Sequence, residues 1–121
     1  GDVYKRQSLA QALENLLRNA IRHSPPQGRV RLNGVLEGDC WHLCLVDDGP
    51  GIEERYLETI FEPFARLDSA RPGDGGFGLG LSIARSAIAL QDGRLWAQSP
   101  PGSGLQMHLL LPAAEVQAQT V

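Results

Sequence analysis

The chain has 121 residues, enough for a single domain with one modest hydrophobic core. Hydrophobic residues make up 42% and charged residues 21%, proportions that are ordinary for a globular protein. The net charge of -3 argues against a nucleic-acid-binding surface, which is normally basic. No apolar run is long enough to cross a membrane, and we expect no direct membrane contact from this part of the protein.

The two cysteines, Cys40 and Cys44, lie in a segment with strand-like character. Four residues of extended chain span about 13 Å, which is too far for a disulfide bond. Two reduced thiols are typical of a cytoplasmic domain, and two cysteines alone do not make a metal site.

The first predicted helix begins at Ser8, which is a suitable N-cap, and ends near Ser24, before two prolines. Residues 1–7 show no clear periodicity, and we interpret them as non-native or truncated sequence outside the domain, which we place at residues 8–112. The apolar residues of the helix recur at helical spacing and form one stripe. They are Leu9, Ala12, Leu13, Leu16, Leu17, Ala20 and Ile21.

The polar side of this helix carries Asn15, Asn19 and Arg22 at positions i, i+4 and i+7, so the three side chains share one face. An amide oxygen is a hard, neutral ligand that suits Mg²⁺, which shares its coordination with waters and phosphates. A solvated helix face is the alternative, and this helix alone does not decide between the two.

Two strand-like runs follow at residues 30–36 and 41–46, and the Gly38-Asp39 pair between them favours an antiparallel hairpin. The second run leads into Asp47-Asp48-Gly49-Pro50-Gly51-Ile52. A carboxylate at a strand end, followed by glycines that permit close approach, suits one edge of a flat ligand. The same residues also fit a simple turn.

A short helix is predicted at residues 53–60, followed by Phe61-Glu62-Pro63-Phe64 and a mixed-charge segment at residues 65–72. Long connections with few apolar residues often cover a site. Arg66 and Arg71 in this segment are placed to reach an anion, although both also fit solvated surface charges.

Five glycines occur between residues 73 and 80, directly before a predicted helix that ends near residue 90. Glycines let a ligand approach the backbone, and a helix start presents unpaired N–H groups and the positive end of its dipole. This arrangement suits a phosphate group, although a flexible hinge also uses glycines. Strands at residues 94–99 and 105–111 and a frayed tail at residues 113–121 complete the predicted order.

Four of these segments, in this order, resemble the motifs of one protein family. Leu13-Glu14-Asn15-Leu16-Leu17-Arg18-Asn19-Ala20 resembles its asparagine box, and Asp47-Asp48-Gly49-Pro50-Gly51-Ile52 its first glycine box. Ile60-Phe61-Glu62-Pro63-Phe64 resembles its phenylalanine box, and Gly76-Phe77-Gly78-Leu79-Gly80-Leu81 its second glycine box. Residues 8–112 thus resemble the catalytic, ATP-binding domain of two-component sensor histidine kinases, in the superfamily shared with gyrase, the MutL mismatch-repair proteins and the heat-shock chaperone ATPases.

The resemblance implies an α/β (α+β) two-layer sandwich of the Bergerat type, in which a mixed, mainly antiparallel sheet packs on helices. It implies ATP and Mg²⁺ as cofactors, with Asn19 as the metal ligand. The implied catalytic residues are Asn15, Asn19, Arg22 and Arg66. The implied nucleotide-binding residues are these four together with His23, Asp47, Gly49, Gly51, Ile52, Arg71, Gly76, Phe77, Gly78, Leu79, Gly80 and Leu81.

The expected activity is transfer of the γ-phosphoryl group to a histidine on a dimerisation and phosphoacceptor domain of the same kinase, which then signals to a response regulator. Hydrolysing members of the superfamily resemble one another in a glutamate one turn before the metal-binding asparagine. Here that position is Asn15, and Glu14 points about 100° away around the helix, so slow hydrolysis is expected. Two alternatives remain open: a degenerate nucleotide-binding regulatory module without catalysis, and an ATP-hydrolysing clamp.

None of His23, His42 and His108 lies in the family's acceptor motif, so the acceptor is expected elsewhere in the parent protein. The resemblance implies that this parent is a homodimer in the plasma membrane, with the present domain in the cytoplasm. Two residues depart from the family pattern: Phe77 stands where a small hydroxyl residue is common, and Leu105 where threonine is frequent. We expect both to alter nucleotide affinity without abolishing function.

Overall fold

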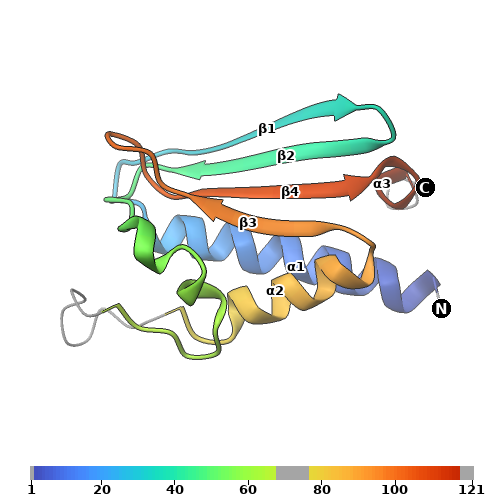
Figure 1. Cartoon of the computed structure of the whole chain (residues 1–121), viewed down its shortest axis with the longest axis horizontal. Coiled ribbons are helices and arrows are strands. Elements are labelled where there is room, and N and C mark those ends of the chain that lie inside the picture. Colours follow the sequence, from blue (N-terminus) through green and yellow to red (C-terminus); the bar gives the residue numbers. More distant parts are fainter. Residues whose placement is uncertain (1, 68–76, 118–121) are drawn as a thin grey trace.

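The structure, a computed structural model, describes residues 2–67 and 77–117. Helices and strands form two layers (Figure 1). The helices are α1 (Asp2–His23), α2 (Gly80–Leu90) and α3 (Ala113–Gln117), and two 3-10 turns are η1 (Glu54–Tyr56) and η2 (Thr59–Phe61). The strands are β1 (Val30–Glu37), β2 (Cys40–Asp47), β3 (Arg94–Gln98) and β4 (Gln106–Pro112).

The four strands form one sheet in the order β1-β2-β4-β3, and each neighbouring pair is antiparallel. β1 and β2 make the predicted hairpin, with Glu37 opposite Cys40 beside the turn. Helices α1 and α2 lie side by side under this sheet (Figure 1). The predicted two-layer sandwich is confirmed, and the sheet of the described chain is wholly antiparallel instead of mixed.

The hydrophobic core lies between the sheet and the two long helices. α1 contributes Leu9, Ala12, Leu16 and Ala20, which recur every three or four residues and are at most 3% exposed. The other buried members come mainly from α2 and the strands: Leu45, Leu81, Ala84, Ala87, Ile88, Leu95, Ala97, Met107, Leu109 and Leu111. Burial of these two helix faces is what fixes α1 and the start of α2 relative to the sheet.

The apolar stripe predicted for α1 is only half buried, which corrects the sequence-based expectation. Leu13, Leu17 and Ile21 remain 39%, 46% and 59% exposed, because α2 covers only one side of α1. β1 is an edge strand, and its Leu32 and Leu36 are exposed as well. The described chain therefore exposes apolar side chains on α1 and on β1.

The predicted start of the first helix at Ser8 is wrong, because α1 already begins at Asp2. The additional turns are held by the residue that caps the C-terminus of α2, since the side chain of Gln91 donates a hydrogen bond from Nε2 to the carbonyl oxygen of Lys5 at 2.9 Å. Gln91 is fully buried, so this contact also meets part of the hydrogen-bonding need of its amide. The predicted end of the helix is confirmed at His23.

Two other predicted segments differ in the structure. The segment predicted as one helix at residues 53–60 instead forms the two 3-10 turns η1 and η2. Only Ile60 and Phe61 in these turns are buried, and both lie in η2, so one short turn is enough to attach the segment to the core. Residues 113–117 form α3 instead of a frayed tail. The backbone N–H of Ala113 donates to Asp39 O at 2.7 Å, and Val116 packs on the core.

No helix in residues 2–67 and 77–117 is both long and apolar enough to span a lipid bilayer.

Candidate functional site

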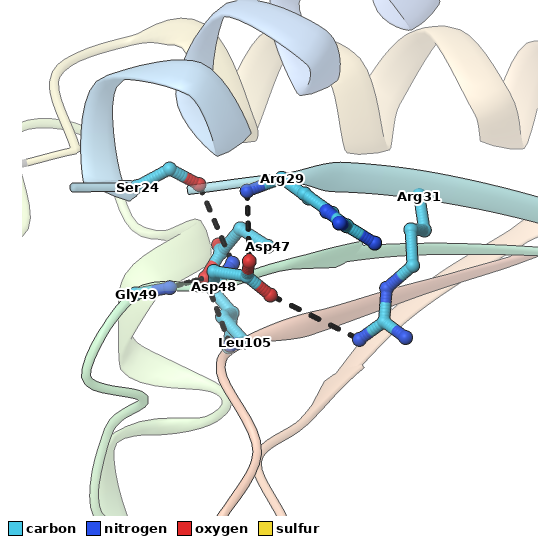
Figure 2. Close-up of polar contacts among 7 residues, drawn as sticks. All are labelled: Ser24, Arg29, Arg31, Asp47, Asp48, Gly49 and Leu105. Carbon is cyan, nitrogen blue, oxygen red and sulfur yellow. Dashed lines mark hydrogen bonds and ion pairs between the residues drawn. The ribbon is translucent and has the colours of Figure 1, made fainter. Parts of the chain in front are cut away.

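The site is built around Asp47, the last residue of β2 (Figure 2). Its side chain is almost fully buried. Asp47 Oδ1 accepts hydrogen bonds from the backbone N–H of Gly49 at 2.8 Å and of Leu105 at 3.2 Å. A backbone hydrogen bond joins the same two segments: the N–H of Asp47 donates to the carbonyl oxygen of Leu105 at 3.2 Å. A buried carboxylate is costly unless it is hydrogen-bonded, and these two donors fix Oδ1 while leaving Oδ2 out of the anchoring bonds.

The backbone around Asp47 is tightly packed, and this explains why glycine occurs at positions 51 and 104. A Cβ atom at Gly104 would overlap the carbonyl oxygen of Asp47, so no larger residue fits there without movement. Gly51 has φ of 74°, a conformation that favours glycine, and the next residue, Ile52, donates its N–H to Ser99 Oγ at 2.9 Å. These contacts join the loop after β2 to the loop between β3 and β4.

A small cavity lies against Asp47 and brings together several residues from separate motifs. Its volume is about 30 Å³, and it is lined by His23, Asp47, Pro50, Gly51, Ile52, Phe77 and Leu105. Five of these were predicted as nucleotide-binding residues. Pro50 was not, and the backbone N–H of Leu105 was also missed, because its position opposite Asp47 depends on strand pairing and not on a local motif.

His23 closes one wall of this cavity and stacks on Phe77, with ring centroids 5.0 Å apart and an angle of 30° between the rings. Its Nε2 atom is buried and has no hydrogen-bond partner among the described residues. Burial lowers the pKa of His23, the charge of Arg22 acts in the same direction, and Asp47 opposes both. The lowered pKa favours the neutral imidazole.

The two asparagines lie at the other end of the site, near the start of α2. Asn15 Nδ2 donates a long hydrogen bond of 3.5 Å to the carbonyl oxygen of Gly80, the first residue of α2. Asn19 is half-buried one helical turn further along the same face, and Arg22 follows on that face. The polar face of α1 is thus directed at the beginning of α2, where unpaired N–H groups favour anions.

The donor chemistry of this face fits Mg²⁺. Asn19 offers an amide oxygen, and Mg²⁺ takes few protein ligands when phosphates and waters complete its coordination. Across residues 2–67 and 77–117, no group of three or more His, Cys, Asp or Glu side chains is placed to hold a metal ion. A Mg²⁺ ion at this face would therefore be held by the Asn19 amide oxygen together with the oxygens of a bound polyphosphate.

The phenylalanine box and the second glycine box meet in the structure. The N–H of Phe64 donates to Gly78 O at 2.7 Å, and the N–H of Phe77 donates to Ala65 O at 2.9 Å. Gly78 has φ of 58°, and a Cβ atom added there would meet no atom of residues 2–67 and 77–117 within 4 Å.

The remaining predicted residues contribute less to the observed geometry. Leu79 is the N-cap of α2, whereas Leu81 is buried in the core, so only its backbone amide is available to a ligand. Arg66 is exposed. Arg71 and Gly76 lie outside the described residues.

A pH dependence of stability follows from two histidines. His108 lies on the face of the sheet away from the helices, where burial and the neighbouring His42, 2.9 Å away between ring nitrogens, lower its pKa. The pKa values of His23 and His108 both fall below the ordinary 6.5, so the unfolded chain binds protons more readily than the folded one. We therefore expect the urea midpoint to fall as pH is lowered from 7.5 to 5.

The matched variant for this pH effect is His108→Gln, which removes one titrating ring and should flatten the decline between pH 7.5 and 5. Glu58 acts in another window, because its hydrogen bond to Arg85 lowers its pKa below the ordinary 4.5 and its contribution is lost only in stronger acid. A urea midpoint that rises on acidification in this range would contradict the expectation.

The fold and the site together define a nucleotide-binding α/β sandwich: a fixed strand-end carboxylate faces a small cavity, and a helix start faces a pair of asparagines. Comparison with known proteins agrees. Residues 4–115 match the family described as "Histidine kinase-, DNA gyrase B-, and HSP90-like ATPase". The chain belongs to this ATPase family, which confirms the predicted ATP-binding domain and the use of ATP.

Similar proteins are sensor kinases. Sensor protein PfeS of Pseudomonas aeruginosa is 63% identical over 107 residues, which cover 88% of this chain and 23% of PfeS. The solved mycobacterial sensor histidine kinase MprB has a TM-score of 0.79 and 34% identity, covering 88% of this chain and 72% of that one. Full-length ShkA in complex with AMPPNP has a TM-score of 0.71 and 28% identity, covering 87% of this chain and 21% of that one.

Proposed function

We propose that this domain binds ATP·Mg²⁺ and transfers the γ-phosphoryl group to a histidine on a separate dimerisation and phosphoacceptor domain of its parent kinase. The observation that carries the proposal is the geometry of Asp47, a buried carboxylate with one oxygen held by two backbone N–H groups. Such a fixed acceptor suits the exocyclic amino group of adenine. The complex of the similar protein ShkA with AMPPNP supports the same ligand class.

Different residues of the site contact the adenine, the phosphates and the metal ion of the proposed ligand. Asp47 accepts the adenine amino group, and the N–H groups at the start of α2 receive the phosphates. Asn19 and Arg22 lie on the polar face of α1, where Asn19 holds the metal and Arg22 neutralises phosphate charge. Bound Mg²⁺ supplies charge neutralisation at the transferred group, while the protein supplies position.

The surroundings of Asn15 support transfer to an acceptor over hydrolysis. The side-chain amide of Asn15 contacts Gly80 and cannot act as a general base. The neighbouring Glu14 is exposed and forms an ion pair with Arg18, Oε1 to Nη2, at 2.6 Å, so it is directed along the outer surface of α1. Glu14 is therefore not placed to activate water at the polar face.

An exposed apolar surface beside α2 supports the docking of the phosphoacceptor domain. A hollow of about 370 Å³ lies between the N-terminal turns of α1 and the length of α2, and its lining includes Tyr4, Ile83 and Leu90, which are 62%, 42% and 50% exposed. Apolar patches of this kind commonly mark protein contacts. A docked phosphoacceptor domain passes its phosphoryl group on to a response regulator. The parent is proposed to be a homodimer in the plasma membrane, with this domain in the cytoplasm.

Phosphotransfer with γ-labelled ATP tests the proposal. We expect label to appear on the separately purified phosphoacceptor domain, in an acid-labile bond, only when the catalytic chain and Mg²⁺ are both present. Phosphate release without the acceptor is expected to be slow, because Asn15 stands where a general base would activate water and Glu14 is directed elsewhere. Rapid acceptor-independent hydrolysis would favour an ATPase clamp, and ATP binding without any labelled acceptor would favour a regulatory module without catalysis.

A further inference from the structure

The cavity beside Asp47 is too small for the ligand that the proposed function requires. Its volume of about 30 Å³ corresponds to one or two water molecules. Small-molecule sites have volumes on the order of 300–1,000 Å³. An adenine base therefore enters this site only after a side chain that now lines the cavity has moved.

Phe77 is the aromatic residue that lines this cavity together with Asp47 and His23. It is 8% exposed, and its ring stacks on His23 with centroids 5.0 Å apart. A flat aromatic ring that shares a cavity with a strand-end carboxylate is placed where a nucleotide base could compete with it. The backbone bond from Phe77 N to Ala65 O, 2.9 Å long, holds the residue at the edge of the site while leaving its side-chain torsions free to change.

With Phe77 lining the cavity, one buried polar atom of the site has no hydrogen-bond partner among the described residues. Among residues 2–67 and 77–117, His23 Nε2 is buried without a hydrogen-bond partner, and a phenyl ring offers neither a hydrogen-bond donor nor an acceptor of comparable strength. A buried nitrogen without a partner is unfavourable. A purine base carries ring nitrogens and an amino group, so its entry can give His23 Nε2 a hydrogen-bond partner, which Phe77 cannot.

We propose that the Phe77 side chain is an internal competitor of the nucleotide base: it occupies the base site in the ATP-free domain and must leave before ATP binds. This inference rests on the proposed function, since it assumes that the cavity at Asp47 is the base site. Its consequence is thermodynamic. The apparent dissociation constant for ATP equals the intrinsic constant divided by the fraction of molecules in which the ring is displaced, so Phe77 weakens ATP binding.

Calorimetric titration with ATP·Mg²⁺ tests this, using the wild-type chain, Phe77→Ala and Phe77→Leu. We expect Phe77→Ala to tighten ATP binding by about tenfold, because no ring has to be displaced. Phe77→Leu keeps most of the packing but not the stacking, so it should fall between the other two and covers the case in which the alanine variant does not fold. Thermal unfolding of each variant establishes that the titrated protein is folded.

Two controls separate competition for the base from general loosening. Phe61→Leu changes another phenylalanine of the core, 5% exposed and covered by the guanidinium of Arg85 at 4.3 Å from the ring centroid. It should lower stability and leave the ATP dissociation constant unchanged. Inorganic tripolyphosphate·Mg²⁺ lacks a base, so its affinity should be the same for the wild type and both Phe77 variants.

Equal or weaker ATP binding by both Phe77 variants would overturn the inference, and so would equal tightening for ATP and tripolyphosphate. These outcomes differ from failure of the proposed function. If the wild-type chain and every variant bind tripolyphosphate but not ATP, or bind neither, the assignment of the base site itself is wrong and the inference falls with it.

Discussion

The substitution Asp47→Asn is expected to weaken ATP binding by about 100-fold, since a hydrogen bond to a charged acceptor contributes roughly 1.5–3 kcal/mol and 1.4 kcal/mol is tenfold. Oδ1 accepts from the N–H groups of Gly49 and Leu105, so an asparagine that keeps both bonds must place its NH₂ group in the position of Oδ2. That NH₂ group is a donor and faces another donor, the adenine amino group. Isothermal titration calorimetry measures the loss directly.

The neighbouring residue provides a matched control for this experiment. Asp48 is exposed, and its Oδ2 accepts the backbone N–H of Arg29 at 2.8 Å, while Arg31 approaches its Oδ1 at 3.9 Å (Figure 2). Asp48→Asn makes the same chemical change one residue later and should leave the ATP dissociation constant within about twofold, because exposed pairs of this kind contribute little. Equal losses in the two variants, or unchanged binding by Asp47→Asn, would show that Asp47 is not the base acceptor.

Asn19→Ala is expected to lower the rate of phosphoryl transfer by roughly 100-fold, in line with the loss of a single group that stabilises transferred charge. Asn19 is half-buried on the polar face of α1, and alanine is the better helix former, so the helix should persist in the variant. ATP binding measured in EDTA should change little, whereas the gain in affinity that Mg²⁺ gives the wild type should disappear. Labelling of the phosphoacceptor domain as a function of Mg²⁺ concentration checks both statements.

An asparagine far from the site serves as the control for Asn19. Asn33 lies exposed in β1, so Asn33→Ala should retain the wild-type transfer rate and Mg²⁺ dependence. A normal response to Mg²⁺ in Asn19→Ala would assign the metal to another ligand and would leave Asn19 with a structural role.

Local sequence patterns determined a large part of this fold. The hairpin between β1 and β2, the end of α1 at His23 and the positions of α2, β3 and β4 all follow from periodicity and from turn residues. The direction of Glu14 was also predictable, because one residue along a helix is about 100° of rotation, and its ion pair with Arg18 agrees with that prediction. The four motifs identified the ATP-binding class because their order is a property of the chain itself.

The tertiary structure decided which of the patterned residues have partners. Periodicity placed Leu13, Leu17 and Ile21 in the apolar stripe of α1, yet these three are exposed, because α2 covers only one side of the helix. In the same way, the extra turns of α1 before Ser8 depend on Gln91, which lies more than 80 residues away in the chain. Spacing along the chain reports which residues share a face, whereas burial depends on what packs against that face.

The same distinction holds within the site. The sequence by itself determined that Asp47 ends a strand beside glycines and that Phe77 lies in a glycine-rich motif before a helix. Only the tertiary structure brought the N–H of Leu105 to Asp47 and the ring of Phe77 onto His23, since both contacts join segments more than 50 residues apart. Pairing between distant strands and packing between distant side chains are set by the whole core, and for that reason no local motif specifies them.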